Sequence, residues 1–418
     1  MDPISAVRGS ASGEEGHSGE AEWRSGWRVV LASLFGIAFG VTGLFFYSTG
    51  VFLKPVAGEF GWSRAAASTV PLIAALALAI TAPFVGAVVD RVGTRIIAIV
   101  SGVGLALGFW LLSQSAANLG TYLSLVVVAV LLGSGASPVV YTRLINLHFR
   151  RSRGAALGIA QTATGIAGAL IPALLIPYVG LHGWRAGYQA LALCAIASLP
   201  ITLLLLGRLP APVAQDPRSV APAGLTFADA MHTSVFYVLV VMLAFAAVGV
   251  GGIIVHLAPM LSDAGMAPNR AGAVASALGF GIIIGRVSTG FLVDRLFAPR
   301  VAFFAFTLAA GGCVMLAYGQ AYWAVAATVM VGLAMGAEID LISYLVARYF
   351  GLVAYGRIYG WLYAVFMVGT SIGPIVAGAA FDRFGNYRLA AMGLGGCLAV
   401  AGLLSWGLPR FQPPIASQ

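Results

Sequence analysis

Gly86-Ala-Val-Val-Asp90-Arg91 is a short sequence that returns 204 residues later as Gly290-Phe-Leu-Val-Asp294-Arg295. A repeat period of 204 residues is much longer than one supersecondary unit. The pattern therefore predicts two similar halves that face each other, with a binding site between them near the middle. Further pairs return at offsets between 201 and 204 residues: Pro55 and Pro259, Gly135-Ala136 and Gly336-Ala337, His148-Phe149 and Tyr349-Phe350, and Gly183-Trp184-Arg185 and Asn386-Tyr387-Arg388.

The composition of the chain indicates that lipid is its main solvent. Of the 418 residues, 60% are hydrophobic and 9% are charged, and the mean hydropathy is +0.95. Because a soluble domain cannot bury so much apolar surface, we expect an all-α membrane protein. Apolar runs of about 20 residues or more predict twelve transmembrane helices, near residues 27–53, 65–89, 95–115, 119–147, 153–178, 185–207, 233–260, 269–293, 299–318, 321–348, 356–380 and 387–409.

One long polar stretch, rich in proline, divides these helices into two groups of six. The predicted organisation is a disordered cytoplasmic tail over 1–26, a six-helix bundle over 27–207, a cytoplasmic linker over 208–232, a second six-helix bundle over 233–409 and a short cytoplasmic tail over 410–418. Residues 1–26 contain no long apolar run, so they are not expected to be a signal peptide.

The distribution of basic residues predicts the orientation in the membrane. Of the 23 lysines and arginines, sixteen lie on the side of the termini, six lie on the other side and Arg286 lies within the membrane. This bias places both termini in the cytoplasm. Because the basic residues stand singly at the ends of apolar runs, they do not form a nucleic-acid patch. We expect a monomeric multi-pass protein of a bacterial cytoplasmic membrane.

Arg286 is a charged residue inside the apolar stretch 271–295. Its guanidinium stays protonated at biological pH, and a charge near the middle of a membrane helix costs at least ~2.5 kcal/mol. Such a residue needs an anionic partner inside the fold or an anionic ligand. Its two parallel N–H donors match a planar carboxylate, which favours a carrier for an organic anion. The alternative is an arginine held in an internal ion pair that never contacts a ligand.

Three further titratable residues are candidates for carrying a proton. Glu338 and Asp340 lie deep in the predicted helix 321–348, where an unpaired ionised carboxylate is costly. One of these acids could balance the charge of Arg286 when the site is empty. His256, three residues before Pro259, could also carry a proton. As alternatives, the acids could bond a neighbouring helix, and His256 could be a hydrogen-bonded structural histidine.

Aromatic residues are expected to line the substrate cavity, because small-molecule sites are mostly apolar. Each of them could equally be a plain packing residue. The candidates, from four predicted helices, are Tyr47, Tyr141, Tyr344, Tyr363 and Phe366.

Several chemical signatures are missing from the sequence. It has no Gly-rich phosphate loop that ends in Lys-Ser or Lys-Thr, no metal-binding cluster of histidine and acidic residues, and no Ser-His-Asp arrangement. We therefore expect no enzyme activity, no cofactor and no metal site.

The repeated loop carries a resemblance to a known family. Gly86-x-x-x-Asp90-Arg91-x-Gly93-x-Arg95 and its second copy, Gly290-x-x-x-Asp294-Arg295, resemble the signature loop of the major facilitator superfamily. The resemblance implies the major facilitator fold, with twelve transmembrane helices in two pseudo-symmetric six-helix bundles. It also implies that these loop residues form a cytoplasmic latch that stabilises one conformation.

Three other stretches look like the monocarboxylate carrier branch of that superfamily, which includes bacterial members and is related to the oxalate/formate exchangers. They are Phe60-Gly61-Trp62-Ser63-Arg64, the stretch 149–158 followed by Gln161, and Phe280-x-x-x-x-Gly285-Arg286-x-x-x-Gly290. In that branch the matching arginine binds the substrate carboxylate, so the resemblance assigns this role to Arg286.

The chain also differs from the carriers that it resembles at positions where those carriers have charged residues. Tyr47 stands where animal monocarboxylate carriers have a lysine, and Ile282 stands where they have an aspartate one turn before the arginine. The usual proton-coupling pair is therefore missing. Residues 358–380 contain no basic residue, unlike the oxalate exchangers. This difference favours a monoanion over a dianion.

Together these features predict a secondary transporter of small monocarboxylates such as lactate or pyruvate, with proton symport by alternating access. One alternative is an exchanger or efflux carrier for other organic acids or drugs. A remote alternative, from a different class, is a membrane receptor that senses a carboxylate.

Overall fold

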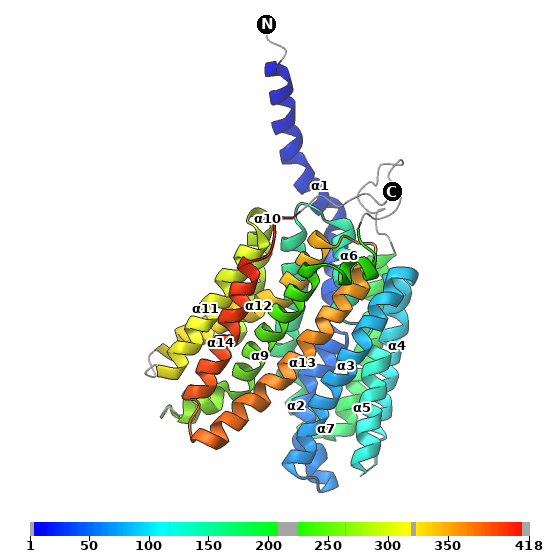
Figure 1. Cartoon of the computed structure of the whole chain (residues 1–418). Coiled ribbons are helices and arrows are strands. Elements are labelled where there is room, and N and C mark those ends of the chain that lie inside the picture. The colour runs from blue at the N-terminus through cyan, green and yellow to red at the C-terminus, as the bar shows by residue number, and fades with distance from the viewer. Residues whose placement is uncertain (1–3, 117, 208–223, 264, 319–322, 412–418) are drawn as a thin grey trace.

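The computed structural model describes residues 4–116, 118–207, 224–263, 265–318 and 323–411. Within these ranges nearly all of the chain is helical. Figure 1 shows two groups of long helices side by side, which come together at the end that carries both termini and diverge toward the opposite end.

The first half of the chain contributes eight helical elements, all but one of them α-helices. They are α1 (Ile4–Ala38), the π-helical turn η1 (Val41–Phe45), α2 (Phe46–Phe60), α3 (Arg64–Val92), α4 (Thr94–Ser113), α5 (Leu119–Gly133), α6 (Pro138–His148) and α7 (Arg153–Leu206).

The second half begins with a short helix and continues with six long ones. They are α8 (Phe227–Met231), α9 (Ser234–Asp263), α10 (Pro268–Arg295), α11 (Ala298–Tyr318), α12 (Ala324–Tyr349), α13 (Tyr355–Phe384) and α14 (Arg388–Trp406). The predicted linker 208–232 lies outside the described residues up to position 223, and α8 occupies part of the remainder. Most of the predicted tail 410–418 is also outside the described residues.

The number of membrane crossings agrees with the predicted twelve. Eleven segments of the described chain are long and apolar enough to cross a membrane. One of them, α7, has 54 residues, or about 80 Å of helix, whereas a bilayer core is about 30 Å thick. Gly183, at φ 83° and ψ 163°, breaks α7 into two helices, so this segment crosses twice. Glycine suits this position because other residues rarely adopt such a backbone conformation.

Two of the predicted helices are interrupted near their middle, and the interruptions contact each other. The predicted helix 27–53 breaks between α1 and η1, and the predicted helix 119–147 breaks between α5 and α6. At the contact the backbone N–H of Val41 donates to the carbonyl of Ala136 at 3.0 Å. A Cβ at Gly40 would lie only 2.0 Å from the same oxygen, so glycine is required for this close approach.

The N-terminal end of the chain differs from the expectation of a disordered tail over 1–26, because α1 is helical from Ile4. The buried carboxylate of Glu22 accepts hydrogen bonds from the backbone N–H groups of Arg150, Arg151 and Ser152, at 3.1 to 3.2 Å. Trp23 packs edge-on against Phe149. These contacts fix the start of the chain to the connection before α7, and no local sequence pattern encodes a partner so distant in the chain.

The two latch aspartates tie the halves together at the end that carries the termini. Asp90, on α3, accepts from the backbone N–H groups of Gly356 and Arg357 at 3.0 and 3.1 Å, at the start of α13. Asp294, on α10, accepts from Gly154 and Ala155 at 2.7 and 2.8 Å, at the start of α7. Each half therefore caps the N-terminus of a helix in the other half, where a negative charge is favoured.

Other residues of the predicted latch have different surroundings. Arg143, on α6, donates from Nε to the Asp90 carboxylate at 2.7 Å. Arg91, Arg95 and Arg295 are exposed, and Gly93 ends α3 with a positive φ of 82°. The carboxylates and glycines of the latch, rather than its exposed arginines, make the contacts between the halves.

Gly86 and Gly290 allow the helices of the two halves to touch. A Cβ at Gly86 would lie 1.8 Å from the carbonyl oxygen of Gly356, and a Cβ at Gly290 would lie 2.5 Å from that of Gly154. Only side chains of minimal size permit such an approach.

We predict that Gly86→Leu separates the halves at the end of the latch, because the new side chain cannot fit against α13. Spin labels at Val92→Cys and Leu296→Cys, in a variant that lacks the three native cysteines, would report a longer distance. Gly58→Leu is the matched control, since a Cβ there meets nothing within 4 Å. An unchanged distance in Gly86→Leu would contradict this role of the glycine.

We also predict that Glu22→Ala destabilises the protein by about 1–3 kcal/mol, because three backbone N–H groups lose a charged acceptor. The thermal unfolding temperature in detergent would fall. Glu20→Ala should leave it unchanged, since the Glu20 side chain is 77% exposed and makes only a long contact with Arg24. Equal unfolding temperatures for both variants would rule out the cap.

Candidate functional site

Arg286 lies on α10 where this helix meets α12 backbone to backbone. A Cβ at Gly336 would lie 2.8 Å from the backbone nitrogen of Arg286, and a Cβ at Gly285 would lie 2.3 Å from the carbonyl of Leu333. The small residues let α12 approach α10 closely enough for its acidic residues to reach the guanidinium. The Arg286 side chain is only 4% exposed.

Asp340 is the anionic partner of Arg286. Its Oδ1 lies 3.5 Å from Nη1 of the arginine, and both side chains are 4% exposed. The pair is longer than a strong charge-assisted hydrogen bond, and Nε and Nη1 of Arg286 and both Asp340 oxygens make no hydrogen bond. The guanidinium therefore has its charge compensated, yet keeps N–H donors that are not used within the protein.

Glu338 adds a second carboxyl group to the same cluster. It is fully buried two residues before Asp340 on α12, and neither of its oxygens has a hydrogen-bond partner. The cluster thus holds one guanidinium and two carboxyl groups. Since burying an unpaired charge is costly, it can stay neutral only if one of the two carboxyl groups carries a proton.

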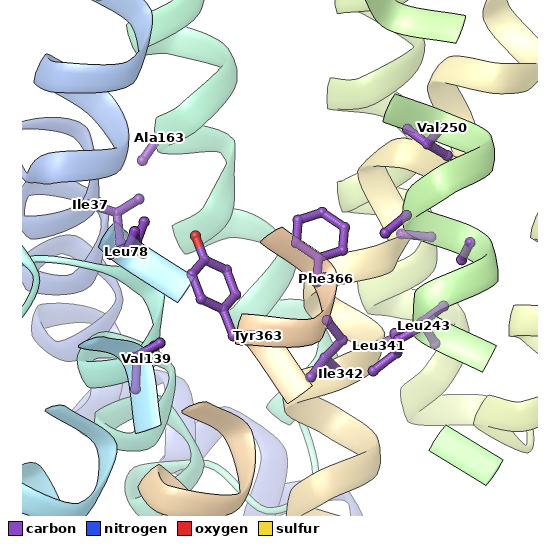
Figure 2. Packing of buried hydrophobic residues seen from close by; sticks show 14 of the residues in the cluster. Ile37, Leu78, Val139, Ala163, Leu243, Val250, Leu341, Ile342, Tyr363 and Phe366 are labelled. Atoms are coloured by element: carbon purple, nitrogen blue, oxygen red, sulfur yellow. The ribbon is translucent and has the colours of Figure 1, made fainter. Parts of the chain in front are cut away.

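A column of aromatic rings on α13 leads to this cluster. Tyr355, Tyr359, Tyr363 and Phe366 stack in succession with ring centroids 5.7, 5.9 and 6.1 Å apart. Figure 2 shows Tyr363 and Phe366 between the two groups of helices, with the Tyr363 hydroxyl toward Ile37 and Ala163 of the first half.

Two of the predicted aromatic residues, Tyr141 and Tyr344, have surroundings of their own. Tyr141 packs against Gly36, where a Cβ would lie 2.0 Å from the tyrosine ring. Tyr344 is buried on α12, one turn beyond Asp340 toward the end of the helix that carries Arg348.

His256 is a histidine bonded on both sides. Its Nδ1 pairs with the hydroxyl of Tyr387 at 2.9 Å, and its Nε2 pairs with the carbonyl of Pro374 at 3.0 Å. It therefore joins α9 to α13 and to the start of α14. The structure thus pairs Arg286 with Asp340, stacks Tyr363 on Phe366, and places Tyr47 over Gly168 of α7.

Sequence reasoning missed a buried polar network between the halves. The Tyr355 hydroxyl bonds Ser343 at 2.8 Å, Thr142 at 3.0 Å and the amide of Asn146 at 3.1 Å, and that amide also donates to Ser343 at 2.9 Å. All four residues are at most 1% exposed. No spacing in the sequence indicated that these side chains meet.

Metal-binding groups are not found in the described part of the chain, where no three His, Cys, Asp or Glu side chains come together. The three cysteines are unpaired.

The family model of the Major Facilitator Superfamily matches residues 35–260 and 237–417. Monocarboxylate transporter 11 of Homo sapiens is 30% identical, with 93% of this chain and 84% of that protein aligned. Monocarboxylate transporter 13 of Bos taurus is 27% identical, with 92% and 89% aligned.

Solved structures share the fold at lower identity. The crystal structure of the transporter FucP in the outward conformation has a TM-score of 0.69 at 17% identity and covers 91% of this chain and 97% of FucP. The human organic anion transporter MFSD10 has a TM-score of 0.67 at 16% identity, with 92% and 99% covered. The predicted fold of two six-helix bundles is thereby confirmed. The chain belongs to the Major Facilitator Superfamily and to its monocarboxylate transporter-like branch, as a multi-pass secondary transporter and not an enzyme.

Proposed function

We propose that this protein transports small monocarboxylates, such as lactate, pyruvate and related 2-oxo or hydroxy acids, together with a proton. The observation that carries the proposal is the buried pair of Arg286 and Asp340, in which the guanidinium keeps unused N–H donors. The names of the relatives, monocarboxylate transporters 11 and 13, support the same substrate class.

The substrate carboxylate takes the place of Asp340 on the guanidinium. Arg286 can then offer two parallel N–H donors to the planar anion, a geometry that gives both strength and orientation. The hydroxyl of Tyr363 binds the polar part of a small acid, and the ring of Tyr47, which lies over Gly168 of α7, contacts its apolar part. A monoanion fits better than a dianion, because Arg286 is the only basic residue that this cluster brings together.

Charge balance makes a proton part of the cycle. In the empty site the ionised Asp340 neutralises Arg286. When a carboxylate occupies the guanidinium, Asp340 loses its partner and an ionised state would leave an uncompensated buried charge, which is strongly unfavourable. Asp340 therefore takes up a proton as the anion binds, and one proton moves with each monocarboxylate. Glu338 is the alternative carrier of this proton.

Alternating access follows from the position of the contacts between the halves. The latch, the glycine contacts and the Tyr355 network all join the halves near the termini. With both termini in the cytoplasm of a bacterial cell, this conformation is closed toward the cytoplasm. Release of these contacts opens the site to the cytoplasm, and a monomer is sufficient for the cycle.

We predict that Arg286→Ala lowers uptake of labelled lactate into proteoliposomes by about 100-fold, because a charge-assisted contact of roughly 3 kcal/mol is lost. Arg286→Ala combined with Asp340→Ala removes the uncompensated acid, so it separates loss of binding from loss of folding. Arg383→Ala, an exposed arginine at the end of α13, is the control. Uptake at the wild-type rate in the double variant would contradict the substrate role of Arg286.

We predict that Asp340→Asn abolishes stimulation of uptake by an inward proton gradient, since the amide cannot exchange a proton, but leaves exchange of internal for external lactate. Glu338→Gln and His256→Phe should keep the stimulation. If Glu338→Gln loses it and Asp340→Asn keeps it, Glu338 is the proton carrier instead. If neither variant loses it, the coupling proton is carried elsewhere.

A further inference from the structure

One face of α7 lies against α10 over the first three turns of α7. Gly154, Gly158, Gln161 and Gly165 follow one another at spacings of four, three and four residues, which places them on one side of a helix. A Cβ at Gly158 would lie 2.5 Å from the carbonyl of Arg286, and a Cβ at Gly165 would lie 3.0 Å from the side chain of Ile283. Gln161 is the one long polar side chain in this otherwise glycine stripe.

Gln161 is buried at the boundary between the halves. Its side chain is 0% exposed. It lies at the level of the Arg286–Asp340 pair, because Gly158, three residues earlier, meets the Arg286 backbone and α7 also contacts α12. Neither of its amide atoms makes a hydrogen bond of full geometry here. A buried amide without a partner is unfavourable by about 1–3 kcal/mol, so a residue that only packed α7 against α10 would be better served by an apolar side chain.

The polar groups around Asp340 come from three other helices. Arg286 faces it from α10 at 3.5 Å, Tyr359 on α13 has a buried hydroxyl without a hydrogen-bond partner, and Gln161 on α7 has a buried amide without one. Glu338 is the other buried acid on the helix of Asp340. Of these residues, Gln161 alone belongs to the first half of the chain.

We propose that Gln161 is the positioning residue through which the first half of the transporter responds to the protonation state of Asp340. The inference rests on the proposed proton symport. A carboxamide has both donor and acceptor atoms, so its N–H group can bond the ionised Asp340 and its carbonyl can accept from the protonated one. One side chain can therefore match Asp340 both in the empty carrier and in the fully loaded one. These are the two electrically neutral states, in which the halves move.

Gln161→Leu tests this role, because it keeps the size of the side chain and removes both hydrogen-bonding functions. We expect the stimulation of lactate uptake by a proton gradient to fall at least fivefold, whereas lactate binding in detergent and exchange of internal for external lactate stay within about threefold of wild type. Gln161→Asn, which keeps the amide on a shorter stem, should recover part of the stimulation. It also keeps the test open if the leucine variant fails to fold.

Thr164→Val is the matched control, because the Thr164 hydroxyl bonds only the carbonyl of Gln161 on its own helix, at 3.0 Å. Wild-type stimulation in Gln161→Leu would overturn the inference, and so would a parallel loss of binding, exchange and stimulation, which indicates a substrate contact or a structural role. If the wild-type protein itself shows no stimulation by a proton gradient, the proposed symport fails, irrespective of Gln161.

Discussion

The cost of a charge in the membrane interior determines how this molecule is built around its centre. Arg286 cannot lose its proton, so the fold supplies it with Asp340 at 3.5 Å and with a second buried acid, Glu338, two residues before Asp340 on α12. The glycines at positions 285 and 336 allow the backbones of α10 and α12 to come together at that depth. In the Arg286–Asp340 pair the charge of the arginine is balanced, but some of its N–H groups make no hydrogen bond. Such an arginine can exchange one anion for another, which is the physical requirement of a carrier.

Small residues also allow the two halves of the chain to contact each other closely. Gly86 and Gly290 touch the first turns of α13 and α7, and the adjacent carboxylates of Asp90 and Asp294 cap those turns. A helix N-terminus stabilises a carboxylate only over its first turn, so these contacts are lost once the halves separate. They stabilise one conformation without holding it permanently, as the two states of a rocking transporter require.

Much of the architecture could be predicted from the sequence, because hydrophobic runs and an internal repeat report directly on lipid exposure and symmetry. The twelve crossings, the two halves and the position of Arg286 in the membrane follow from these signals. The sequence offered two candidate anionic partners for Arg286, Glu338 and Asp340. These acids lie two residues apart on one helix, and periodicity does not tell which of them contacts α10. The surroundings of Tyr141 and Tyr344 could not be predicted for the same reason, because composition does not say which way a buried helix is rotated.

Other contacts had no signal in the sequence at all. The cap of Glu22 on residues 150–152, the Tyr355 network and the place of Gln161 at the level of Asp340 bring together residues more than 120 positions apart in the chain. Two of these join the halves, so they depend on the conformation as well as on the fold. His256 illustrates the converse, since a titratable residue in a helix proved to have both ring nitrogens bonded.

Proton symport is best measured as uptake of labelled lactate and pyruvate by the wild-type protein in proteoliposomes, with and without an inward proton gradient. If a proton moves with each monocarboxylate, the gradient accelerates uptake and drives accumulation above the external concentration. Uptake that ignores the gradient but is stimulated by internal anion would contradict proton symport and identify an exchanger. No uptake of either acid would contradict the proposed substrate class.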